Sequence, residues 1–316
     1  MAQVSVTSAP RDFNTEAADS ALTLRTTRIS RAFKNAVWEL WKNRLATIGA
    51  VMVFILFLVA VLAPVLATHD PVKQNYREML QPPSAAHYFG TDKFGRDIWS
   101  RTVWGAQRLV TIAVLAVTIG LLGGIPLGTI SGYYGGKLDV ILMRVVDAWL
   151  AFPGILFYLL AATLIRAYEL SLFWNTVGLI IALGVARMPD TARLVRGTVL
   201  AEREKDYVEA SHATGESQLY IAFRQVLPNC LSPVIVQATI ALGFELLIIA
   251  SLSFLGLGAP PPTPDWGADL NLAREHMETR PYLAIFPGLA ISFAVLGFNL
   301  IGDGLRDILD PRIADR

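Results

Sequence analysis

Charged residues are scarce in this sequence: Asp, Glu, Lys and Arg together make up 17% of its 316 residues, against about 25% in soluble domains. Apolar residues account for 53%, and the mean hydropathy is +0.47. A water-soluble protein of this size could not bury so much apolar surface, and the same composition excludes an intrinsically disordered chain. The composition therefore indicates a membrane protein that crosses the bilayer several times.

Net charge is also nearly absent, at +1, so no basic surface field is expected to attract nucleic acid. The single cysteine, Cys230, excludes an internal disulfide and is predicted to be a small buried apolar residue. No cofactor-binding motif is present, and we expect no cofactor.

Catalytic motifs are missing as well. The nearest approach to the phosphate-binding loop G-x-x-x-x-G-K-[ST] is the stretch 132–138, whose spacing is wrong, and we interpret it as a tight turn. No G-x-S-x-G motif occurs. The four histidines lie outside the predicted spans and show no spacing typical of a metal site, so we expect solvated loop residues: His69, His87, His212 and His276. The chain is not predicted to be an enzyme.

Six apolar runs approach or exceed the roughly 20 residues that cross a bilayer core. They are continuous rather than alternating, which excludes a β-barrel, and a lone segment in lipid must satisfy its own backbone hydrogen bonds as a helix. The sequence thus predicts an all-α membrane protein with six transmembrane helices, near residues 45–67, 108–131, 139–165, 171–188, 232–257 and 282–302.

The distribution of basic residues predicts the orientation. With the N-terminus in the cytoplasm, 18 of the 27 Lys and Arg residues fall on the cytoplasmic side. Both termini are therefore expected there. We divide the chain into a flexible cytoplasmic tail (1–30), an N-terminal part with the first span and an external segment (31–105), and a core with the other five spans (106–316). Residues 31–44 are either an amphipathic helix on the membrane surface or the start of the first helix.

The segment 187–230, between the fourth and fifth spans, carries six basic and six acidic residues. Residues 198–211 contain good helix formers without Gly or Pro and predict one helix. Gly215 should end it. Residues 216–226 predict a second helix, which Pro228 should stop or kink. We expect an ordered helix–turn–helix at the cytoplasmic surface.

This segment contains Glu209-Ala210-Ser211, then Gly215, then Leu227-Pro228, and it resembles the EAA motif of ABC importer permeases. Ser211 stands where the motif has its second Ala. Gln225 stands where a branched apolar residue is usual, which puts the local packing in question.

Other motifs narrow the resemblance to the C-type permeases of dipeptide and oligopeptide importers. They are Gly90-Thr91-Asp92, Gly95-Arg96-Asp97, Ser100-Arg101 and Gly105, the stretches 253–258 and 261–267, and the tail motifs in 299–311. The resemblance implies the permease fold of type I binding-protein-dependent importers, in a bacterial or archaeal plasma membrane. It implies partners: a second permease, two ATP-binding subunits that hydrolyse ATP, and an extracytoplasmic binding protein.

The same resemblance implies a coupling surface against an ATP-binding subunit, made by Asp206, Tyr207, Glu209, Ala210, Ser211, Gly215, Leu227 and Pro228. Short peptides are the implied solute, with nickel or glutathione as alternatives. An ion-coupled secondary transporter would need an internal repeat and several ionisable residues at the midplane. The sequence has no visible repeat, and Glu245 is its one clear candidate for such a residue.

Charged residues within spans are functional candidates. Glu245 serves either bundle packing or the translocation pathway. Arg144 and Asp147 stand three residues apart, which predicts a local salt bridge. Small residues in the spans are expected to permit close helix packing: Gly120, Gly123, Gly124, Gly128, Gly184 and Gly243.

Overall fold

The computed structural model describes residues 43–169 and 171–309, and within them it is helical, without a β-strand. The expected tail 1–30 and nearly all of 31–44 lie outside the described residues.

The elements are α2 (Arg44–Val61), α3 (Ala63–Leu66), η1 (Tyr76–Glu78), α4 (Ile98–Tyr134), α5 (Gly136–Leu150), α6 (Gly154–Ala167), α7 (Leu172–Glu202), α8 (Asp206–Ala213), α9 (Gln218–Tyr220), the π-helical η2 (Ile221–Val226), α10 (Leu227–Asn229), α11 (Leu231–Phe254), α12 (Trp266–Ala273), η3 (Arg274–His276) and α13 (Tyr282–Leu309).

Five helices in the described part are long and apolar enough to cross a membrane: α2, α4, α7, α11 and α13. The predicted third span is different. It is formed by α5 and α6, which meet at 76°, so the expectation of one continuous helix over 139–165 is wrong. Pro153 explains the break, because proline disfavours the helical conformation of the residue before it, and Pro153 itself is the N-cap of α6. Counted as one bent span, this pair brings the total to six.

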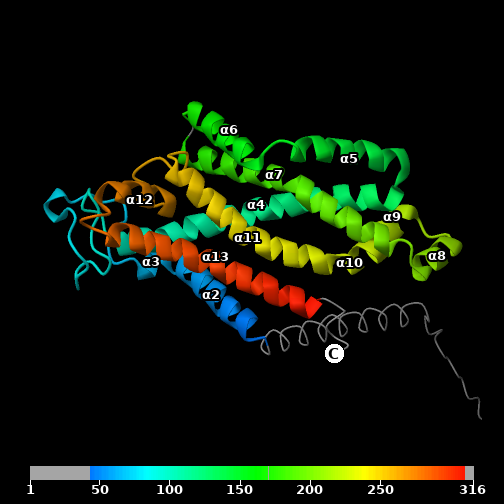
Figure 1. The fold of residues 1–316 in the computed structure, drawn as a ribbon, viewed down its shortest axis with the longest axis horizontal. Helices are drawn as coiled ribbons and strands as arrows, with labels where there is room; N and C mark the ends of the chain where they lie inside the picture. Colours follow the sequence, from blue (N-terminus) through cyan, green and yellow to red (C-terminus); the bar gives the residue numbers. More distant parts are fainter. Residues whose placement is uncertain (1–42, 170, 310–316) are drawn as a thin grey trace, which may run out of the picture.

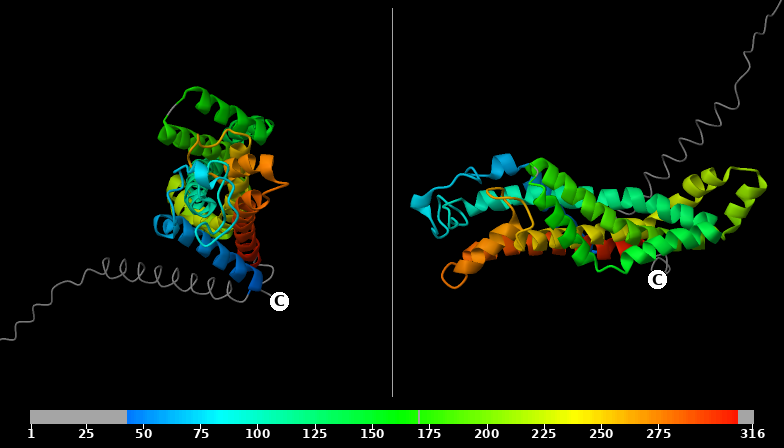
Figure 2. Two further views of the ribbon diagram at one scale, coloured as in Figure 1. Left: turned by 90° about the vertical axis from the view of Figure 1, so that its left-hand side faces the viewer. Right: turned by 90° about the horizontal axis from the view of Figure 1, so that it is seen from above.

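The long helices form an elongated bundle (Figures 1 and 2). Helix α4 packs most extensively against α7, while α13 packs between α2 and α11. The α5–α6 pair lies along the outer side of α7. The segment 62–97 and α12 share one end of the bundle, here called the α12 end, and α8 and α9 occupy the opposite α8 end (Figure 1).

A row of glycines on α4 allows its close contact with α7. A Cβ added at Gly128 would lie 2.4 Å from the carbonyl oxygen of Ala192, and one added at Gly124 would lie 2.5 Å from Thr191 Cβ. From the other side, a Cβ at Gly184 would lie 2.6 Å from Ile119 Cβ. The predicted packing role of these glycines is confirmed, because each one marks a place where two helices meet without room for a side chain.

The α12 end is closed by a buried cation. Arg101 forms a bidentate pair with Asp269 on α12, its Nη2 lying 2.6 Å from Oδ1, and its Nη1 donates to the carbonyl oxygens of Pro71 and Pro262 at 3.0 Å each. The indole of Trp266 donates to the Thr102 carbonyl at 2.7 Å. These bonds tie the 62–97 segment and the proline-rich loop to the start of α4.

Candidate functional site

The segment that resembles the EAA motif begins where α7 ends. Helix α7 continues to Glu202, so residues 187–202 belong to a long helix rather than to a separate loop. Residues 203–205 then turn the chain, and the prediction of one helix over 198–211 is wrong. The side chain of Arg203 donates to the Gly132 and Tyr133 carbonyls at 2.8 and 3.2 Å, at the end of α4. This tertiary contact fixes the turn, although no Gly or Pro marks it.

The inner face of α8 packs on a small apolar cluster, here called the Val208 cluster. Val208 is the one buried residue of α8, and it packs in a cluster with Ile221, Ala222 and Val226 of η2 and with Val195 and Val199 of α7. The inner face of the helix is thereby packed against the end of α7.

Gln225 links the two arms of the turn. Its Oε1 accepts a hydrogen bond from Ser211 Oγ at 2.6 Å, and its Nε2 donates to Glu216 Oε2. The residue that departs from the usual motif therefore pairs with the other departing residue, Ser211. At this position the polar bridge through Gln225 takes the place of the apolar contact that the usual branched residue would make.

Tyr207 makes a second link across the turn. Its hydroxyl donates to Glu202 Oε1 at 2.9 Å and accepts from Asn229 Nδ2 at 3.1 Å. Burial, more than the neighbouring Glu202, raises the pKa of the Tyr207 phenol to about 12. The phenol is therefore a neutral hydrogen-bonding group at physiological pH.

The outer face of the turn is solvent-exposed and acidic. Asp206, Glu209 and Ala210 are exposed on α8, and both acids lie in its first turn. Gly215 follows with a φ of +79° and with nothing within 4 Å of a Cβ built on it. The predicted end of the helix at this glycine is confirmed.

The last two motif residues do not contribute to that face. Leu227 packs against the Val208 cluster, and Pro228 lies in the short α10, after which the chain restarts as α11. The expected interruption near Pro228 is thus present. Of the residues assigned to the coupling surface, Asp206, Glu209, Ala210 and Gly215 are exposed on the outside. Tyr207, Ser211 and Leu227 make supporting contacts, and Pro228 is exposed in α10.

The one charged residue predicted deep in a span is paired. Glu245 on α11 is fully buried, and its Oε1 lies 3.0 Å from Nη2 of Arg187 on α7. Its Oε2 has no hydrogen-bond partner among the residues that the structure describes. Arg187 belongs to the segment predicted as a loop, but α7 extends to Glu202 and places Arg187 on a helix opposite Glu245.

The predicted local pair between Arg144 and Asp147 is wrong. Asp147 instead contacts Arg193 on α7 at 2.5 Å, with both side chains more than half exposed. Nearby, Asp139 on α5 forms a bidentate pair with Arg196 at 2.5 and 2.6 Å. Contacts between helices take precedence here over the pairing within one helix.

A hollow of about 790 Å³ opens where α5 and α6 bend against α7. Its lining is mainly apolar, with Trp149, Phe157 and Tyr158, and its polar members are Arg144 and Asp190. Glu245 is not among the lining residues. The carboxylate of Glu245 therefore lies behind the wall of the hollow, of which Tyr158 and Asp190 are the nearest members.

Comparison with known proteins decides the family. Residues 124–315 match the family described as the binding-protein-dependent transport system inner membrane component, and residues 32–83 match the N-terminal transmembrane domain of oligopeptide transport permease C. The chain belongs to this transporter family. It is accordingly a multi-pass protein of the inner membrane with the fold of ABC importer permeases, as its resemblance predicted.

Relatives in this family cover nearly the whole chain. The dipeptide transport system permease protein DppC of Alkalihalophilus pseudofirmus is 42% identical over 281 residues, which are 89% of this chain and 90% of that protein. DppC of Haemophilus influenzae is 40% identical and covers 91% and 98%. The glutathione transport system permease protein GsiD of Escherichia coli is 40% identical and covers 87% and 90%. Each of these relatives is named a transport system permease protein.

A solved structure has the same fold. The inward-facing MetNI methionine ABC transporter in its selenomethionine soak crystal form aligns with a TM-score of 0.53 at 19% identity. The match covers 67% of this chain and 97% of that one. The likeness applies to the fold alone.

Proposed function

We propose that this chain is one of two permease subunits of an ATP-driven importer for short peptides. Its partners would be a second, homologous permease, two ATP-binding subunits and an extracytoplasmic binding protein that delivers the solute. ATP hydrolysis is assigned to the partners because this sequence has no phosphate-binding loop. The strongest support is the membership of a family of binding-protein-dependent permeases over most of the chain.

The peptide assignment is supported by the names of the relatives, two of which are dipeptide permeases. Glutathione is the second candidate, since a glutathione permease is nearly as similar. Uptake of a labelled dipeptide by the reconstituted complex, in competition with unlabelled glutathione or Ni²⁺, separates the three solutes. Excess unlabelled dipeptide should reduce this uptake, whereas glutathione and Ni²⁺ should leave it unchanged.

The exposed acidic face of α8 and the Gly215 turn carry the proposal for coupling. The Val208 cluster, the Gln225 bridge and Tyr207 fix this face to the ends of α7 and α11. When ATP closes the partner subunits, α8 moves with them, and α7 and α11 follow as rigid elements. The open hollow beside α5 and α6 is then the part of this chain that contributes to the translocation path, and Glu245 serves the bundle interior.

The orientation follows from the same assignment. The α8 end lies in the cytoplasm together with both termini, and the α12 end lies outside, where a binding protein docks. The excess of Lys and Arg on the predicted cytoplasmic segments supports this orientation.

Substitution of Gly215 tests the coupling. A β-branched residue at positive φ costs about 1–2 kcal/mol of local strain, which is too little to unfold the bundle. Gly215→Val should leave membrane insertion normal and abolish most uptake. Gly256→Val is the matched control, because Gly256 has a φ of +82° and equally open surroundings outside the α8 segment. Equal transport by the two variants at equal abundance would reject the coupling role.

Reversing a charge tests the same face independently. Glu209→Lys should weaken the association with the ATP-binding subunits in a salt-dependent way if Glu209 meets a basic surface. Glu278→Lys makes the same change at an exposed position of the α12 end. It should leave the association unchanged.

A further inference from the structure

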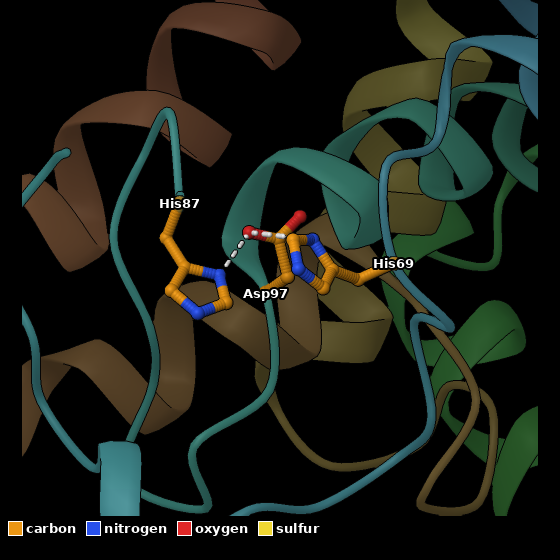
Figure 3. Close-up of side chains that lie close together, drawn as sticks. All are labelled: His69, His87 and Asp97. Carbon is orange, nitrogen blue, oxygen red and sulfur yellow. Dashed lines mark hydrogen bonds and ion pairs between the residues drawn. The ribbon is translucent and has the colours of Figure 1, made fainter. Parts of the chain in front are cut away.

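Two histidines and an aspartate converge at the α12 end (Figure 3). His69 follows α3, His87 lies in the loop before α4, and Asp97 is the N-cap of α4. Oδ1 of Asp97 lies 2.9 Å from Nδ1 of His87 and 3.9 Å from Nδ1 of His69. Sequence spacing predicted solvated histidines, which is wrong for His87, because that residue is 8% exposed.

The carboxylate of Asp97 is held in a fixed orientation. Its Oδ2 accepts hydrogen bonds from the Ser100 amide at 2.8 Å and from the Ser100 hydroxyl at 2.6 Å. Asp97 itself is 2% exposed. Oδ1 is consequently directed at the two imidazole rings, whose centroids lie 4.6 Å apart with a tilt of 33°.

The three ligand atoms lie close enough together to share one metal ion. They all lie within 4.8 Å of one another. Zinc bonds to nitrogen and oxygen are about 2.0–2.2 Å long, which places neighbouring ligand atoms about 3.3 Å apart in a tetrahedron. The distances from Asp97 to the two histidines lie on either side of this value. His69 can adjust, because its side chain is 43% exposed and its Nδ1 lies near Asp97 and the rotatable hydroxyl of Thr68.

A second carboxylate, that of Glu78, lies behind His87. Oε2 of Glu78 lies 3.6 Å from Nε2 of His87, on the side of the ring away from Asp97. Histidine ligands of metals commonly direct their second ring nitrogen at such a carboxylate, which fixes the ring and makes it more basic. Glu78 therefore lies where such a carboxylate would stand if His87 bound a metal, and it also accepts a hydrogen bond from Asn75.

We propose that His69, His87 and Asp97 bind a divalent transition-metal ion at the α12 end, and that zinc fits best. Two imidazoles and one carboxylate suit zinc, and the exposed side of His69 leaves the fourth position to water. The bound ion would fasten the 62–97 segment to the start of α4. The proposal does not depend on the solute or on coupling to ATP.

Zinc content of the full chain in lipid nanodiscs tests the site. The protein is stripped of metal with EDTA, reloaded with zinc and freed of excess metal. Its zinc content is then measured by inductively coupled plasma mass spectrometry. One zinc ion per chain is expected for the wild type. His69→Ala should lose it, while His276→Ala, which changes the other histidine of the α12 end, should keep it.

The affinity of the site for metal gives a second test, in which none of the three ligand residues is removed. Titration with Co²⁺ should produce the visible absorption of a tetrahedral site in the wild type, and Zn²⁺ should displace it. Glu78→Gln should weaken zinc binding about 10–100-fold without abolishing it. Equal zinc content in wild type and His69→Ala, or no retained zinc in the wild type, would overturn the proposal and leave a His–Asp hydrogen-bond network only.

Discussion

Arg187 on α7 and Glu245 on α11 form an ion pair of 3.0 Å, in which the carboxylate is fully buried and its second oxygen has no hydrogen-bond partner in the described part of the chain. A carboxylate in this position depends on its one cation, because desolvation of an unpaired charge costs several kcal/mol. The pair therefore specifies how α7 and α11 meet in the bundle interior.

The first prediction removes the cation. Arg187→Met should destabilise the protein by about 3–5 kcal/mol, because it leaves Glu245 buried without a partner. The double variant Arg187→Met with Glu245→Leu should recover most of this loss, since an apolar pair of similar volume is often as stable as a buried ion pair. Thermal unfolding in detergent measures both effects.

Arg193→Met is the matched control on the same helix. Its partner is Asp147, and both side chains are more than half exposed, at 54% and 56%. Exposed pairs contribute about 0–1 kcal/mol, so little change in unfolding is expected. If Arg187→Met were as mild as Arg193→Met, the buried pair would have no structural role.

The second prediction concerns the glycines between α4 and α7. Gly128→Ala places a Cβ 2.4 Å from the Ala192 carbonyl oxygen, so the helices must separate. A destabilisation of about 1–3 kcal/mol is expected from such overpacking. Gly197→Ala on α7 is the control, because nothing lies within 4 Å of its Cβ. It should be neutral or stabilising by up to about 1 kcal/mol, the gain in helix propensity. The unfolding midpoint of Gly128→Ala should therefore fall, and that of Gly197→Ala should stay unchanged or rise.

Most of the bundle was predictable because a membrane span is encoded locally. Length and continuous apolarity identify α2, α4, α7, α11 and α13 without knowledge of their neighbours. The bend between α5 and α6 also had a local signal in Pro153. The sequence nevertheless predicted one span over 139–165, because the whole stretch is apolar on both sides of Pro153.

The third prediction tests orientation by labelling. Ala86 at the α12 end and Ala213 at the α8 end are both exposed, so each can be replaced by cysteine. The native Cys230 is 2% exposed and should stay unreactive. In sealed cells, a membrane-impermeant thiol reagent should label Ala86→Cys and spare Ala213→Cys until the membrane is permeabilised. The reverse pattern would invert the proposed topology.

The candidate sites were less predictable than the helices, because they depend on tertiary contacts. The role of Gly215 at the end of a helix could be predicted from its residue type alone. The pairing of Asp147 with Arg193, the turn at Arg203 and the approach of His69 to His87 join residues that lie far apart in the sequence or on different helices. No periodicity or spacing within one segment contains that information, because these contacts depend on how the segments pack against one another.

The last prediction addresses the bridge through Gln225. Gln225→Ile supplies the branched apolar residue that is usual in the resembling motif, and it removes the hydrogen bonds to Ser211 and Glu216. Each such bond contributes about 0.5–1.5 kcal/mol, so the loss is local and the bundle should remain folded.

Hydrogen exchange of the segment 203–229 is the appropriate measurement, because it reports local opening. Exchange should quicken in Gln225→Ile, whereas the amides of α4 and α13 should be unaffected. Ser211→Ala alone should give a similar acceleration, and the double variant should add little to it, since both changes break the same bond. If Ser211→Ala also restores slow exchange to Gln225→Ile, the apolar pair typical of the motif is an equivalent solution. If instead neither variant alters exchange, the Val208 cluster alone holds α8, and the polar bridge contributes nothing to its position.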